Sequence, residues 1–107
     1  MNFNSYNIVN NEKQMQFEIE ENGKTAYLPY RYYKKDVAFL NTYVPVELRE
    51  KGMAGALAKA AFEFAKKLNK PVIAYCPFVA SFIKKHTEYN GQLDPEFHKD
   101  SQPPGIT

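Results

Sequence analysis

The residues with the clearest chemical potential lie between Arg49 and Gly55, where two basic residues and two glycines fall within seven positions. A strand-like segment ends just before this stretch, and an alanine-rich helical pattern begins within it. Amide groups in the first turn of a helix have no partners inside the helix, and glycines let a phosphate approach them closely. The spacing therefore predicts an anion site, although it fits equally well a tight turn in which the glycines serve only the backbone.

Cys76 is the candidate nucleophile. It is the one cysteine of the chain and stands between a predicted strand and a predicted helix. The dipole at the start of a helix can lower the pKa of a thiol. A lone cysteine is more often a packing residue, so a chemical role and a structural role both stay open.

The two histidines support weaker hypotheses. His86 follows Lys84 and Lys85, so it could contact an anion, relay a proton or cap the last carbonyl groups of a helix. His98 has no assignable role. Two histidines and one cysteine at these separations form no set of ligands, so we expect no metal.

The composition is that of one small globular domain. The chain has 107 residues, of which 44% are hydrophobic and 24% charged, enough for one core but not for two. A net charge of +2 without a basic block gives no reason to expect nucleic acid. With one cysteine, no signal-peptide pattern and no apolar run near the roughly 18 residues of a membrane span, we expect a cytoplasmic protein without membrane contact. We expect it to be a monomer or a weak dimer.

A sheet is predicted before the anion stretch. Strands are expected at residues 6–9, 14–20, 25–33 and 37–44. Asn22-Gly23 is the strongest short hairpin signal and connects the second of these strands to the third. The strand over 37–44 is the most apolar and suits the middle of the sheet, and Pro45 ends it.

Helices dominate the remainder. Helices are expected at residues 52–68 and 78–86, with a strand at 71–75 between them. The strand over 71–75 follows the 37–44 strand through a helix, so the two should be parallel, with a right-handed crossover. We expect one α/β domain over residues 1–90, a mixed, mostly antiparallel sheet of about five strands with one long and one short helix. Residues 91–107 should form a loosely held tail with one docked turn near Leu93 or Phe97.

The string from Arg49 to Ala54 resembles the acetyl-CoA motif Q/R-x-x-G-x-G/A of the GNAT N-acetyltransferase superfamily. Three further strings extend the likeness: Asn41-Thr42-Tyr43-Val44-Pro45, Cys76-Pro77-Phe78-Val79 and Ile83-Lys84-Lys85-His86-Thr87-Glu88-Tyr89. Together they resemble the small single-domain branch of N-acetyltransferase domain-containing proteins, over roughly residues 6 to 90.

The resemblance implies a GNAT-like acyl-CoA N-acyltransferase fold that uses acetyl-CoA as cosubstrate. The strand edge before Pro45 would pair with the pantetheine arm, and amides of the glycine-rich turn would hold the pyrophosphate. The implied cofactor-binding residues are Thr42, Tyr43, Val44, Arg49, Lys51, Gly52, Met53, Ala54, Gly55, Pro77, Phe78, Phe82, Lys85 and His86. We expect the Met53 side chain to point away, into the core. The candidate catalytic residues are Cys76 and Asn41.

Two departures from the family bear on the chemistry. Many relatives have histidine where this chain has Asn41, and an amide is no general base near neutral pH. The larger enzymes also have two helices between their first two strands, whereas residues 10–13 are too few for any, so the acceptor side should be open. The leading function is transfer of an acetyl group from acetyl-CoA to an amine or protein acceptor by direct attack. The alternatives are transfer through a Cys76 thioester, or a CoA-binding or protein-interaction module with little catalysis.

Overall fold

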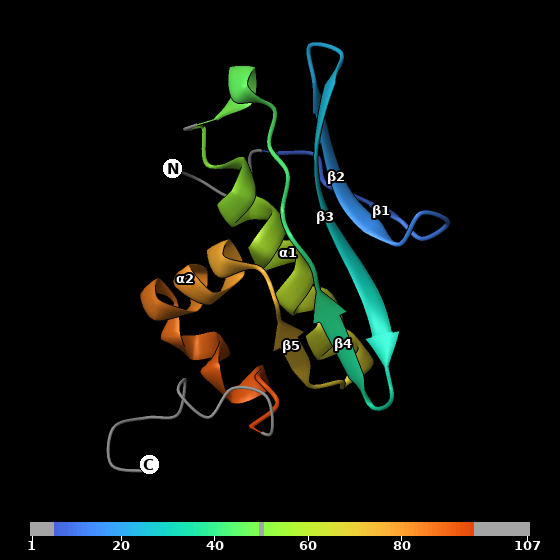
Figure 1. The fold of residues 1–107 in the computed structure, drawn as a ribbon, viewed down its shortest axis with the longest axis vertical. Coiled ribbons are helices and arrows are strands. Elements are labelled where there is room, and N and C mark those ends of the chain that lie inside the picture. Colours follow the sequence, from blue (N-terminus) through green and yellow to red (C-terminus); the bar gives the residue numbers. More distant parts are fainter. Residues whose placement is uncertain (1–5, 50, 96–107) are drawn as a thin grey trace.

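A computed structural model describes residues 6–49 and 51–95. Five strands form one sheet in the order β1-β2-β3-β4-β5, antiparallel except for the parallel pair β4–β5 (Figure 1). The strands are β1 (Val9–Asn11), β2 (Gln16–Glu21), β3 (Lys24–Tyr33), β4 (Asp36–Phe39) and β5 (Val72–Ala74). Among the described residues the helices are α1 (Met53–Leu68), α2 (Pro77–Lys85) and two 3-10 helices, Val46–Leu48 and Thr87–Gln92. The predicted fold class, a mixed sheet with one long and one short helix, is confirmed.

The β2–β3 hairpin forms at the predicted dipeptide. Asn22 and Gly23 have φ angles of 55° and 76°, the left-handed pair that a type I′ turn requires. Along β2, Phe17 and Ile19 are buried and their neighbours are not, so one face of the hairpin meets the core. The turn thus fixes the register of the two longest strands.

Helix α1 packs its apolar stripe on β2 and β3, and α2 and the second 3-10 helix pack on α1 (Figure 1). Leu57, Ala61 and Phe62 have no exposed surface. The Phe62 ring lies between Phe39 of the sheet, at 6.0 Å, and Phe82 of α2, at 6.1 Å between centroids. This aromatic contact joins the helices to the middle of the sheet and fixes where the first turn of α1 stands.

The predicted strand over 37–44 differs from the observed one. Strand β4 ends at Phe39, and the ladder resumes only at an isolated bridge between Tyr27 and Tyr43. Tyr30 pairs with Phe39, so three residues of this strand, 40–42, lie opposite two residues of β3, 28–29. One extra residue on one strand is a β-bulge, which bends the strand and redirects it. The first strand also shifts, from the predicted 6–9 to Val9–Asn11.

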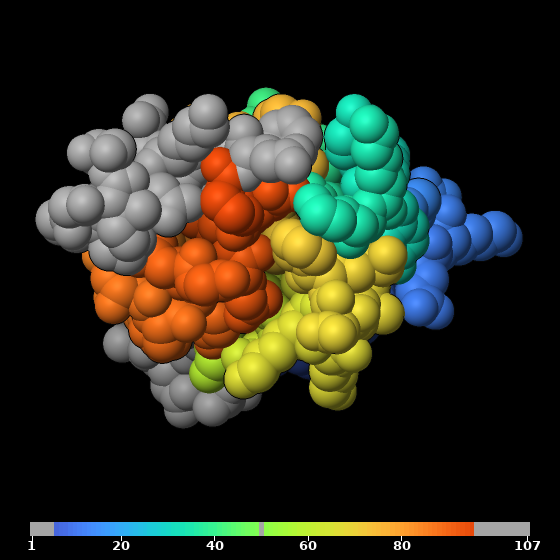
Figure 2. Space-filling view, turned by 90° about the horizontal axis from the view of Figure 1, so that it is seen from below, coloured from blue at the N-terminus to red at the C-terminus, as the bar shows by residue number. Residues whose placement is uncertain are grey.

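The chain after α2 is held against β5. Leu93 forms a parallel bridge with Val72, and the Asp94 N–H donates to the Val72 carbonyl at 2.9 Å. The Lys35 ammonium bonds the Asp94 carboxylate at 2.7 Å and the Asp36 carboxylate at 3.3 Å, so this segment is tied to the β3–β4 turn as well. Figure 2 shows these parts side by side from below. Leu93, near which one docked turn was predicted, thus lies in a bridge to β5, and Phe97 lies outside the described residues.

Candidate functional site

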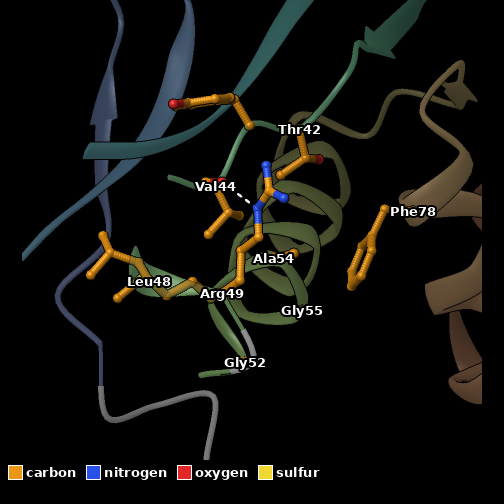
Figure 3. Close-up of a pocket in the computed structure, with 10 residues that line it drawn as sticks. Thr42, Val44, Leu48, Arg49, Gly52, Ala54, Gly55 and Phe78 are labelled. Atoms are coloured by element: carbon orange, nitrogen blue, oxygen red, sulfur yellow. Dashed lines mark hydrogen bonds between the residues drawn. The ribbon is translucent and has the colours of Figure 1, made fainter. Parts of the chain in front are cut away.

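A groove opens between the strand extension after β4, residues 42–44, and the first turn of α1. Its volume is about 460 Å³ (Figure 3). The Phe78 ring, from the start of α2, lies across from the strand extension. The lining residues are Thr42, Tyr43, Val44, Leu48, Arg49, Gly52, Met53, Ala54, Gly55 and Phe78.

The groove exists because the parallel strands separate. Strand β4 pairs with β5 through Phe39, whose carbonyl accepts from the Tyr75 N–H at 3.0 Å. Beyond this bond the β-bulge bends one strand toward β3, and Pro77 at the first position of α2 turns the other chain away. Cys76 stands at the fork.

The strand extension presents one backbone edge to β3 and the other to the groove. The Tyr43 N–H and carbonyl both pair with Tyr27, at 2.8 and 2.9 Å. Backbone groups of successive strand residues point to opposite edges, so those of Thr42 and Val44 face the groove. Within the described part of the chain, the Thr42 carbonyl and the Val44 N–H have no hydrogen-bond partner. The edge can therefore pair with an extended ligand, as an exposed strand pairs with a peptide.

The start of α1 is the second polar feature of the groove. Gly52 precedes the helix with a φ of 79°, in the left-handed region that favours glycine. Among the residues that the structure describes, no side chain caps the helix, and its first turn contains no acidic residue. The first helical bond runs from the Ala56 N–H to the Gly52 carbonyl, which leaves the amides of Met53, Ala54 and Gly55 without intrahelical acceptors. Such a helix start attracts anions.

The loop that leads into α1 is held from outside the groove. The Tyr6 hydroxyl donates to the Lys51 carbonyl. The Lys51 ammonium pairs with the Glu21 carboxylate at 3.2 Å, and Lys24 pairs with Glu47 at 3.6 Å. The β2–β3 hairpin thus pairs with one basic and one acidic side chain of this loop, Lys51 and Glu47.

Cys76 is buried, with 3% of its surface exposed, and its sulfur meets Thr42. The Thr42 N–H donates to Sγ at 3.3 Å, and the Thr42 hydroxyl oxygen lies 3.4 Å from it. Burial alone would raise the pKa of this thiol. The bonds from Thr42, with those from the Val79 and Phe78 amides, outweigh burial, so the pKa of Cys76 lies below its ordinary value.

Nine of the residues predicted to bind the cofactor line this groove, and five do not. Those outside are Lys51, Pro77, Phe82, Lys85 and His86. Phe82 is 4% exposed and stacks on the His86 ring at 4.3 Å, so both belong to the packing of α2. The His86 backbone N–H closes α2 by donating to the Phe82 carbonyl at 2.9 Å, and the predicted cap by the His86 side chain stays a prediction.

Several other predictions can be placed. The Met53 side chain is 1% exposed and packs in the core, as expected, while its backbone lines the groove. Asn41 is exposed within the β-bulge, and neither it nor Cys76 lines the groove itself. Leu48 lines the groove but was not predicted. Leu48 could have been found from the sequence, because it is an apolar residue three positions after Pro45, the residue at the cap of the 3-10 helix.

Residues 6–49 and 51–95 contain neither a metal-binding cluster nor a membrane-spanning helix. No cluster there of three or more histidine, cysteine, aspartate or glutamate residues could hold a metal ion. In the same ranges, neither helix combines the length and the apolar character that crossing a membrane requires.

The fold and the groove define a class of protein. Residues 16–93 match the family model described as GCN5-related N-acetyl-transferase, and the chain belongs to this family. Among its relatives, Protein NATD1 of Xenopus tropicalis is 31% identical over 96 residues, covering 85% of this chain and 88% of the relative. Protein NATD1 of Danio rerio is 33% identical over 87 residues, covering 77% of this chain and 79% of the relative.

Proposed function

We propose that the protein binds acetyl-CoA in the groove and transfers the acetyl group to an amine by direct attack. The observation that carries this proposal is one groove with two complementary polar features. A strand edge with two open backbone groups, the Thr42 carbonyl and the Val44 N–H, lies along one wall, and a helix start that no described side chain caps lies at the other. Acetyl-CoA has the matching parts, an arm with two amides and a pyrophosphate.

The strand edge suits the pantetheine arm. The Thr42 carbonyl would accept from an arm amide, and the Val44 N–H would donate to an arm carbonyl. The apolar walls, among them Val44, Leu48 and Phe78, would cover the methylene groups of the arm.

The start of α1 suits the pyrophosphate. Three amides without intrahelical acceptors and the positive end of the helix dipole would stabilise an anion there. Because Lys51 is paired with Glu21, attraction would come mainly from backbone amides. We therefore expect affinity in the micromolar range rather than the nanomolar range, about 8 kcal/mol of binding free energy.

With the arm on this edge, the thioester would lie near the fork at Thr42 and Cys76. A neutral amine would attack the thioester carbonyl carbon, the new C–N bond would form and the C–S bond would break. The CoA thiolate would leave, and the amine proton would pass to water. The contribution of the protein would be to position the two substrates and to orient backbone N–H groups toward the carbonyl oxygen. The exposed amide of Asn41 could donate a hydrogen bond to the acceptor but could not accept its proton.

Transfer through Cys76 is the second candidate, favoured by the lowered pKa of its thiol. It is weaker because the sulfur is buried and already engaged by Thr42. Intact mass after incubation with isotopically labelled acetyl-CoA separates the two. Direct attack predicts an acetylated acceptor amine without an acetyl group on the protein. An adduct on Cys76 that added amines discharge would establish transfer through the thiol. Saturable CoA binding with hydrolysis only at the background rate would indicate a binding module.

A further inference from the structure

The β2–β3 hairpin has a face that α1 does not cover. Phe17 and Ile19 of β2 are buried on the side where α1 packs. Side chains of a strand alternate between the two faces of the sheet, so Glu18 and Glu20 point away from α1. Glu18 is half-buried there and Glu20 is exposed. Strand β2 therefore presents two carboxylates on the face opposite α1.

A row of side chains leads from these carboxylates to the fork. Glu18 pairs with Tyr27 of β3, and Tyr27 pairs with Tyr43 of the strand extension, so the three side chains share one face. The Tyr27 and Tyr43 rings are 5.3 Å apart between centroids, and Tyr43 is 47% exposed. Tyr43 follows Thr42, which stands at the fork. We call the surface of Glu18, Glu20, Tyr27 and Tyr43 the open face.

The Glu18 carboxylate is held in place, but it is not neutralised. Its Oε2 accepts from the Gln16 side-chain amide at 2.6 Å and from the Asn11 side-chain amide at 3.0 Å. Both donors are uncharged, and within the described part of the chain neither Glu18 nor Glu20 forms an ion pair. Glu18 Oε1 accepts no hydrogen bond from those residues either. A fixed carboxylate with an open oxygen suits a cationic partner.

The geometry of the open face sets how far such a cation lies from the fork. Neighbouring strands are about 4.8 Å apart, so Glu18 lies roughly 10 Å from Tyr43, across two strand spacings. An extended chain rises about 3.3 Å per residue, and every second side chain points the same way. A cationic side chain about two to four residues from a lysine at the fork can therefore reach Glu18. The two tyrosine rings between them suit the apolar stem and the charge of a lysine or arginine.

We propose that the open face selects as acceptor a lysine in an extended protein segment that carries a second cationic residue about two to four positions away. The target amine enters the fork from this face, because α1 covers the other face of the hairpin. The second cation pairs with Glu18, and Glu20 adds negative charge beside it. Glu18 is thus a specificity-determining residue that acts at a distance from the reacting amine. This inference rests on the proposed function, because it assumes that the thioester lies at the fork.

The test compares two peptides that have blocked termini and one acceptor lysine each. The residues two and four positions to either side of this lysine are arginine in one peptide and citrulline, a neutral isostere of arginine, in the other. Transfer from labelled acetyl-CoA gives kcat and KM for each peptide with the wild type, Glu18→Gln and Glu88→Gln. The variant Glu18→Gln keeps the length of the side chain and an oxygen that can accept from Gln16 and Asn11.

Glu88 is the matched control, because its variant removes the same charge from an exposed position elsewhere. It lies in the second 3-10 helix, which packs on α1 and α2, and it forms no ion pair with a described residue.

We expect the wild type to have a KM about fivefold lower for the arginine peptide than for the citrulline peptide. Glu18→Gln should reduce this preference to about twofold or less, and high salt should reduce it in the wild type as well. Glu20→Gln, a second variant, should reduce it by a smaller factor. Glu88→Gln should keep the preference of the wild type. Equal KM values for the two peptides in the wild type would overturn the proposal, as would a preference that Glu18→Gln leaves intact.

A binding measurement separates this proposal from the proposed function. The arginine peptide is titrated into the 15N-labelled protein without acetyl-CoA, and the spectra also report whether each variant is folded. Saturable shifts at the amides of Glu18 and Tyr27 that weaken in Glu18→Gln would support the proposal, and the absence of such shifts would overturn it. If the wild type acetylates neither peptide, the proposed function fails, and the titration still decides whether the open face binds the second cation.

Discussion

Thr42 and Cys76 meet across the fork between the two parallel strands, with the Thr42 N–H 3.3 Å from the Cys76 sulfur. The contact links the β-bulge after β4 to the residue that precedes α2. It marks the inner end of the strand edge, beyond which the chains belong to the core. This contact could hold a reactive thiol or could only fix the shape of the fork. The variant Cys76→Ala distinguishes these two roles.

Cys76→Ala should keep acetyl transfer within about tenfold of the wild-type kcat, because direct attack needs no sulfur and the loss of one small side chain shifts the fork only slightly. Binding of CoA should be unchanged. Steady-state kinetics and intact mass check this outcome. Complete loss of turnover with intact CoA binding would instead show that the thiol carries the acetyl group.

Gly52→Ala should lower the free energy of unfolding by about 1–2 kcal/mol, because its left-handed φ of 79° is unfavourable for a residue with a Cβ. It should also weaken CoA binding by disturbing the start of α1. Gly23→Ala is the matched control, since its φ of 76° is nearly the same and it lies in the hairpin turn. Chemical denaturation should show similar destabilisation of both variants, and calorimetry should show weaker binding in Gly52→Ala alone. Equal CoA binding by the two variants would show that the turn at Gly52 does not belong to the ligand site.

The local parts of this structure could be predicted from the sequence because they follow from short-range rules. Asn22-Gly23 specified its hairpin, and the apolar spacing between Met53 and Leu68 specified α1. The β-bulge at 40–42 could not be predicted, because it depends on contacts with residues distant in the sequence. Tyr43 pairs with Tyr27 of β3, and Thr42 bonds Cys76. The strand-like pattern of the sequence runs without a break to Val44, whereas the backbone pairing with β3 is interrupted between Phe39 and Tyr43.

The side-chain partners around the groove were equally beyond sequence reasoning. The family resemblance predicts that Lys51 contacts the phosphates through its backbone, and it does not predict that the Lys51 ammonium pairs with Glu21 of the hairpin. Arg49, from the same motif, lies in the groove and bonds Val44. Spacing alone treats the two basic residues alike, and only the packing of the hairpin against the loop distinguishes them.

Asp36→Asn should reduce the gain in stability that the wild type obtains on acidification. Burial, together with a hydrogen bond to Asp94, raises the pKa of Asp36, and Lys35 offsets this only in part. Because the pKa of Asp36 is raised, the native protein binds more protons than the unfolded chain at pH values just above the ordinary pKa of 3.8. This residue therefore makes the unfolding free energy rise as the pH falls into that window and fall as the pH rises out of it.

Denaturant unfolding of both proteins at several pH values between neutrality and the ordinary aspartate pKa checks this prediction. The variant should be at least as stable as the wild type at neutral pH, and the difference should shrink on acidification. A difference that grows as the pH falls would mean that the Asp36 carboxylate is stabilised as an anion, contrary to this account.

Tyr89→Phe should lower the unfolding free energy by about 1 kcal/mol, because the Tyr89 hydroxyl donates to the Glu63 carboxylate at 2.9 Å. Burial, with the bond to Glu63, raises the pKa of Tyr89 to about 12. The native protein thus keeps this proton above the ordinary value of 10.0, and stability from this residue is lost as the pH rises through that window. Ultraviolet titration should show a late-ionising tyrosine that disappears in the variant. An unchanged titration curve would contradict the assignment.

The central claim is that one groove holds the arm of acetyl-CoA on the strand edge and its pyrophosphate at the start of α1. An NMR titration of the 15N-labelled protein with CoA tests it most directly. We predict saturable shifts in the micromolar range, largest at the amides of Thr42 and Val44 and at those of Met53, Ala54 and Gly55. The amides of β1 and of Gly91 should not move. Absence of saturation, or shifts that are largest away from these two segments, would contradict the claim.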